Sequence, residues 1–94
     1  MQPKKVKINR LIHFQPDQPD LIHFEAIVRF SNGFVKASAV YGTSQEAIAA
    51  ARWLIKHWTP RIENLPPEYQ QSQAEADKLW ATGEEVESSQ EIEL

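Results

Sequence analysis

Apolar residues change their spacing along the chain near residue 42. Between Val6 and Tyr41 they recur at every second position, which is the period of a β-strand with one buried face. From Thr43 onward they recur at intervals of three and four residues, the spacing of an amphipathic helix. The pattern predicts a small α+β domain in which the strands come first and a helix covers them.

Three strands are predicted in the first part of the chain, over residues 6–14, 21–30 and 34–41. Pro16 and Pro19 separate the first two, since proline cannot donate to a strand ladder. Asn32-Gly33 joins the second strand to the third, and this dipeptide is typical of a two-residue type I′ hairpin turn. The strands are therefore expected to form an antiparallel meander with the second strand in the centre.

A two-residue turn also predicts which residues face each other. It pairs Val28 with Ala37 and Phe24 with Tyr41, so that apolar side chains meet on one face. The same face receives the first strand if Ile8 lies opposite Val28. Because side chains alternate between faces, a slip of one residue would move every side chain of a strand to the other face.

A long amphipathic helix is predicted from Thr43 to about Pro60. Thr43-Ser44-Gln45-Glu46 has the form of a capping box, in which Thr43 and Glu46 bond to each other's backbone amides. Proline at position 60 should end or kink the helix because it lacks an amide donor. The stripe that should cover the sheet consists of Ala47, Ala51, Leu54 and Trp58.

The rest of the chain predicts a second helix and a disordered end. Pro66 or Pro67 suits a first helical turn, and Gly83 suits the stop. Residues 84–94 contain five glutamates and few apolar side chains, which is typical of disorder. The predicted fold is an α+β domain over residues 1–83: a three-stranded antiparallel meander packed against one long helix, with a second C-terminal helix and then an acidic disordered tail.

Composition narrows the classes of function. The chain of 94 residues is too small for a deep enclosed pocket, and without cysteine it has neither disulfides nor cysteine-bound zinc. No apolar run approaches the roughly 20 residues of a bilayer-spanning helix. Removing the five tail glutamates from the net charge of -3 leaves +2 for residues 1–83. We expect a cytoplasmic protein that is not an enzyme and needs no cofactor.

Basic residues are expected to line up on the outer face of the sheet, away from the helix. The predicted register aligns Lys7, Arg29 and Lys36 across the strands, with Lys5 near one end and Phe34 beside them. Such a row attracts phosphates, and an exposed aromatic ring can stack a base. The row is a candidate nucleic-acid surface, and a solvated face without a ligand is the simpler interpretation.

Two histidines share this outer face. The tetrapeptide Leu-Ile-His-Phe occurs at residues 11–14 and 21–24, and the predicted register places His13 directly opposite His23. Two imidazoles can ligate a metal ion, but a zinc site needs three or four ligands and only Glu25 is close. Two exposed strand histidines are the simpler interpretation, and the pair is a weak alternative metal site.

Trp53 lies outside the apolar stripe of the long helix, close to His57. Tryptophan is enriched in the hot spots of protein interfaces. Either the second helix folds back over Trp53 through Tyr69 or Trp80, or a partner protein covers it. The candidate partner-binding residues are Trp53, His57, Phe34 and Lys36.

Residues 24–51 resemble two families of small domains. With Gly42-Thr43 after the last strand and Glu46-Ala47 at the start of the helix, the segment resembles the strand-strand-helix part of HicB-type antitoxin domains. More faintly, it resembles the last three strands and final helix of double-stranded RNA-binding domains, although Gln45 and Glu46 stand where that family has lysines. Either resemblance implies a topology and a binding role rather than catalysis.

The leading functional hypothesis is a small non-enzymatic interaction module, an antitoxin-like inhibitor or an adaptor, that binds a partner protein. The alternative is a nucleic-acid-binding protein that uses the basic sheet face. No membrane partner is expected. A homodimer through an open sheet edge is a further alternative, because the predicted meander has two such edges.

Overall fold

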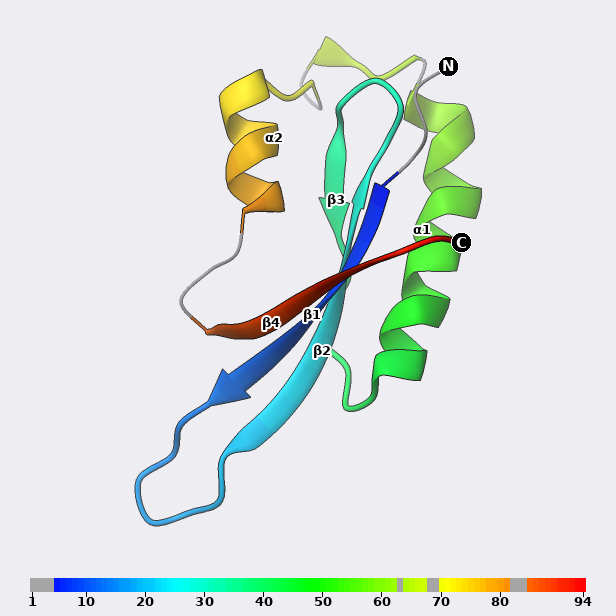
Figure 1. The fold of residues 1–94 in the computed structure, drawn as a ribbon. Coiled ribbons are helices and arrows are strands. Elements are labelled where there is room, and N and C mark those ends of the chain that lie inside the picture. Colours follow the sequence, from blue (N-terminus) through cyan, green and yellow to red (C-terminus); the bar gives the residue numbers. More distant parts are fainter. Residues whose placement is uncertain (1–4, 63, 68–69, 82–84) are drawn as a thin grey trace.

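The computed structural model describes residues 5–62, 64–67, 70–81 and 85–94. In chain order the elements are β1 (Lys5–His13), β2 (Leu21–Arg29), β3 (Val35–Ala37), α1 (Ser44–Ile62), α2 (Gln73–Trp80) and β4 (Val86–Ile92). The strands form one antiparallel sheet in the order β3-β2-β1-β4, with α1 along one face and α2 on the other (Figure 1). The α+β class is as predicted, but the sheet has four strands rather than three.

The pairing of β1 with β2 differs from the predicted register by two residues. Ile8 faces Ala26, and Val6 faces Val28. A shift of two residues leaves every side chain on its predicted face, because the side-chain period of a strand is two, so alternation alone cannot detect it. The hairpin of β1 and β2 extends beyond both helices (Figure 1), and Phe14 at its end is 81% exposed.

The turn between β2 and β3 is not the predicted type I′ turn. Gly33 donates to the carbonyl of Phe30 at 2.9 Å, and Phe30 donates to the carbonyl of Phe34 at 2.8 Å. Gly33 has a φ of 92°, whereas Asn32 does not have the positive φ that a type I′ turn requires. The connection is therefore a three-residue loop with glycine in its last position, and Val28 pairs with Lys36 instead of Ala37.

This one-residue change of register places the side chains of β3 on the opposite faces from those predicted. Val35 packs with Ile27 and with Ala76 of α2, while Phe34 joins the core under α1. A second irregularity restores the predicted pairing of Phe24 with Tyr41 beyond the end of β3. There the Ser38 hydroxyl accepts from the amide of Ala26 at 2.9 Å, taking the place of a strand carbonyl.

The first helix, α1, begins as predicted and ends later. Thr43 Oγ1 accepts from the Glu46 amide at 3.2 Å, as in a capping box. The helix continues through Pro60 to Ile62, which is buried in the core. Packing of this last turn therefore overrides the interruption expected from proline. The helix covers the sheet with buried Ala47, Ala51 and Leu54.

The second helix, α2, is shorter than predicted. It comprises Gln73–Trp80 and starts at Ser72, whose side chain accepts from the amide of Glu75 at 3.1 Å. Residues 70–72 precede it without helical structure. The two prolines suit a first helical turn, but the capping by Ser72 sets the start here. No helix in the described part of the chain is long and apolar enough to cross a membrane.

The prediction of a disordered tail over residues 84–94 is wrong for Val86–Ile92, which form β4 along the outer edge of β1. Ile92 packs against the core, and Arg10 forms an ion pair with Glu87 at 2.5 Å. Asn9, only 1% exposed, accepts from the hydroxyl of Ser89. The low apolar content of this segment predicted disorder, but backbone pairing with β1 orders it.

The loop at Gly33 can be tested by substitution. A Cβ at Gly33 would meet no atom within 4 Å, so Gly33→Ala should destabilise only through its φ of 92°, by about 1–2 kcal/mol. Gly42→Ala is the matched control, since a Cβ there also meets nothing and its φ lies outside the positive region. Chemical denaturation should show a loss for Gly33→Ala alone. Equal effects of the two changes would contradict this role of the loop.

Candidate functional site

Phe34 and Lys36, both predicted on the outer face, lie instead on the α1 side of the sheet. The Phe34 ring stacks on Trp58 with centroids 6.0 Å apart, and the Lys36 ammonium lies 4.8 Å from the centroid of Trp58. Phe34 is 9% exposed, so it is a core residue rather than a contact surface. Lys36 is half-buried and borders solvent.

Trp53 is a large aromatic side chain of α1 that remains exposed to solvent. It is 56% exposed, and its ring lies 4.4 Å from the ring of His57. Trp80 does not cover it, because α2 packs on the opposite face of the sheet (Figure 1). Tyr69, the other predicted cover, lies outside the described residues.

Trp53 stands over a groove of about 590 Å³ between α1 and the chain that leaves β3. Alanines line both walls, Ala37 and Ala39 on one side and Ala49 and Ala50 on the other. Their short side chains leave the space open, and Leu54 and Tyr41 add apolar surface. Ala37 and Ala39 are exposed, although the predicted register places both in the core.

The edge of β3 runs beside this groove. The amides of Phe30 and Ser38 take part in bonds between β2 and the β3 segment, so residues 34, 36 and 38 turn their backbone groups toward β2. Val35 and Ala37 therefore turn theirs outward. Gln71 satisfies Val35 in full: its Oε1 accepts from the Val35 amide and its Nε2 donates to the Val35 carbonyl, both at 2.9 Å.

The predicted basic row is not assembled on one surface. Lys7 and Arg29 lie on the α2 side, where their charged groups are 4.6 and 5.0 Å from the centroid of Trp80. Arg29 is also paired with Asp77 at 3.0 Å. Lys36 lies on the other face, and Lys5 is exposed at the start of β1. Two of the four cations expected to meet phosphate, Lys7 and Arg29, instead hold α2 on the sheet.

Lys7 is 6% exposed and donates to the backbone carbonyl of Trp80. Burial is the main cause that lowers the pKa of the Lys7 ammonium below its usual 10.5. The charge of Glu91 opposes this shift, that of Arg29 adds to it, and that of Glu25 opposes it. A lysine in this setting supports tertiary structure rather than a ligand.

His13 and His23 come together as predicted, although they are diagonal rather than directly opposite. Leu11 pairs with His23, and the two imidazole centroids are 5.3 Å apart. His13 also lies 3.4 Å from the carboxylate of Glu85. Among the described residues there is no group of three or more acidic, histidine or cysteine side chains that could hold a metal ion.

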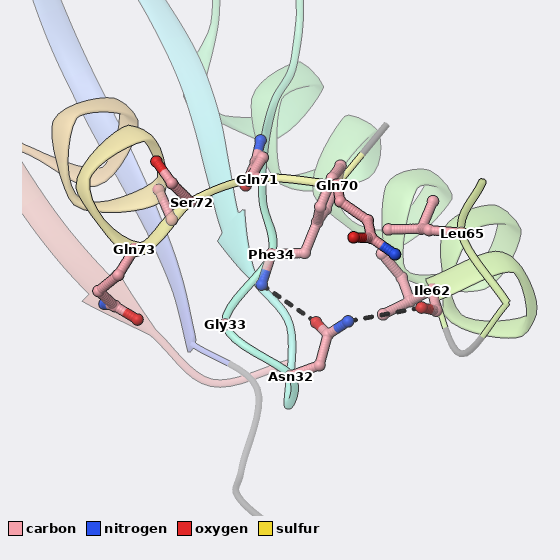
Figure 2. Close-up of a pocket in the computed structure, with 10 residues that line it drawn as sticks. Asn32, Gly33, Phe34, Ile62, Leu65, Gln70, Gln71, Ser72 and Gln73 are labelled. Carbon is pink, nitrogen blue, oxygen red and sulfur yellow. Dashed lines mark hydrogen bonds between the residues drawn. The ribbon is translucent and has the colours of Figure 1, made fainter. Parts of the chain in front are cut away.

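A second cavity, of about 270 Å³, lies under the β2–β3 loop (Figure 2). Its lining includes the amide side chains of Asn32, Gln70, Gln71 and Gln73. Asn32 is already engaged, since it accepts from the amide of Phe34 at 3.0 Å and donates to the carbonyl of Ile62 at 3.4 Å (Figure 2). Gln71 is likewise bonded to Val35, and Gln73 donates to Asp77, so most of these amides are already engaged and the Trp53 groove is the stronger candidate site.

The sequence singled out Trp53, which lines this groove, and His57 and Lys36, which do not line it, but it did not predict the groove itself. The sequence carries a signal for the groove in the alanines at positions 37, 39, 49 and 50. It also missed Gln71, whose role depends on the position of β3. No family model, curated protein or solved structure matches the chain. The resemblance to HicB-type antitoxin domains therefore stays a prediction.

The lowered pKa of Lys7 predicts a pH dependence of stability. Between its folded-state pKa and 10.5, the unfolded chain binds more protons than the folded chain, so this residue makes the free energy of unfolding rise with pH. Lys7→Gln keeps a donor for Trp80 and removes the titration. The wild type should therefore gain stability relative to Lys7→Gln as pH rises through this window, as measured by denaturation. A constant difference would contradict the assignment.

Proposed function

We propose that this chain is a small interaction module that acts by binding a partner protein, without catalysis, and that the Trp53 groove is its contact site. The observation that carries the proposal is a half-exposed tryptophan over an apolar groove next to a sheet edge with outward backbone groups. Tryptophans in such settings supply much of the binding energy of protein interfaces. An adaptor or an antitoxin-like inhibitor fits this description.

The nucleic-acid alternative receives less support. Lys7 and Arg29 surround Trp80, and Lys36 lies on the other face, so a phosphate backbone would not meet the three together. A homodimer through β4 is also less favoured. Pairing two copies antiparallel about Ser89 would set Glu87 against Glu91 of the second copy, and like charges directly opposite are destabilising.

The proposal predicts that Trp53→Ala strongly weakens binding while the fold remains. Proteins captured from the source cells by the wild type would be purified and titrated against both forms. Loss of a central tryptophan should weaken binding by about 30-fold or more, which corresponds to 2 kcal/mol. Arg52→Ala is the control, because Arg52 is exposed on α1 but does not line the groove.

Thermal unfolding of the three proteins should be similar, since Trp53 is not part of the core. A partner that binds the wild type and Trp53→Ala equally would remove the groove as the contact site.

A further inference from the structure

We infer that the groove takes an extended segment of the partner, which adds as a strand to the edge of β3 and places a carboxylate at the end near Lys36 and Arg61. This inference rests on the proposed function and names the chemistry of its ligand. Three independent features of the groove support it: the state of the strand edge, the shape of the walls, and the distribution of charge.

The first feature is the edge of β3. Gln71 bonds to both backbone groups of Val35, as a neighbouring strand would, and so closes the edge at that position. Ala37 is the next residue with outward backbone groups, and no described residue bonds to them. An added strand can therefore start beside Gln71 and run along Ala37 toward Tyr41, which is how sheet edges bind extended peptides.

The second feature is the shape of the groove. It lies between the chain that leaves β3 and α1, and Ala49, Ala50 and Trp53 line it from the helix. A strand added at Ala37 would direct alternate side chains into this space, because side chains alternate across a strand. Apolar side chains fit there, since alanine, leucine and tryptophan line it.

The third feature is charge. Trp58 has two cations against its ring, Lys36 at 4.8 Å and Arg61 at 5.9 Å. The ion pairs among the described residues are Arg10 with Glu87, His13 with Glu85, and Arg29 with Asp77, so neither Lys36 nor Arg61 has a carboxylate partner there. These two cations are therefore available to a carboxylate of the ligand.

The charge also gives the groove a direction. Tyr41 lies at the end where α1 starts, and Phe34 lies against Trp58 near the end of α1, so α1 runs antiparallel to β3. Glu46 consequently lines the end of the groove opposite to Lys36 and Arg61. A carboxylate is repelled at the Glu46 end and attracted at the other. The ligand is thus an apolar extended segment with an acidic residue at one end.

A library of displayed random linear decapeptides tests this inference. Peptides selected on the full chain and counter-selected on Trp53→Ala should carry Asp or Glu at one end of an apolar stretch. Their affinity should fall at least 10-fold for the double variant Lys36→Glu and Arg61→Glu, and it should fall with added salt. Arg52→Glu is the charge control and should leave affinity unchanged, because Arg52 is exposed on α1 and does not line the groove.

Two further measurements examine the strand addition. Ala37→Pro removes one outward amide at a sheet edge, where proline is tolerated, and should weaken the selected peptides at least 10-fold. Methylation of alternate backbone nitrogens in the peptide should do the same without any change to the protein, so a folding defect cannot mimic the result.

Each outcome decides a different point. Trp53-dependent peptides without acidic residues, or insensitive to both Ala37→Pro and backbone methylation, would overturn this inference and leave the proposed function standing. Failure to select any Trp53-dependent peptide would also overturn it. If, in addition, the partner protein binds Trp53→Ala with the same affinity as the wild type, the proposed function is also wrong.

Discussion

The position of β3 depends on the three-residue loop that ends at Gly33. With glycine at positive φ and Phe30 paired to Phe34, the strand enters the sheet one residue out of the register that a two-residue turn would impose. That single step sends Val35 toward α2 and Phe34 toward α1. Both helices depend on this placement, because each packs against a side chain that the loop directs to its face.

On each face of the sheet, a tryptophan ring lies against two cationic side chains, but the two clusters differ in their surroundings. On one face, Trp80 of α2 lies against Lys7 and Arg29, which fixes a short helix with little apolar surface of its own. On the other face, Trp58 lies against Lys36 and Arg61 at the margin of the core. In the first cluster Arg29 is paired with Asp77, whereas neither cation of the second has a carboxylate partner among the described residues.

The sheet edges are also treated differently. The edge of β1 is covered by β4, whose side chains are mostly exposed and include Glu87 and Glu91. The edge of β3 is closed at Val35 by the side chain of Gln71 and stays open at Ala37. Unpaired strand edges invite association, and proteins usually block them. The edge of β3 is therefore blocked at Val35 and open at Ala37, where it borders the apolar groove.

By itself, the sequence determined the period change near residue 42, the start of α1 at its capping box, the strands β1 and β2, and the position of Trp53 outside the apolar stripe of α1. These depend on local chemistry, which a single segment carries. Tertiary structure decided the shift of two residues between β1 and β2, because the alternation of side chains is the same after an even shift. It also decided the orientation of β3, and with it the groove, because Asn-Gly is compatible with more than one type of loop. It also decided β4, since the order of an acidic segment came from pairing with β1, a contact across some 80 residues that no local pattern records.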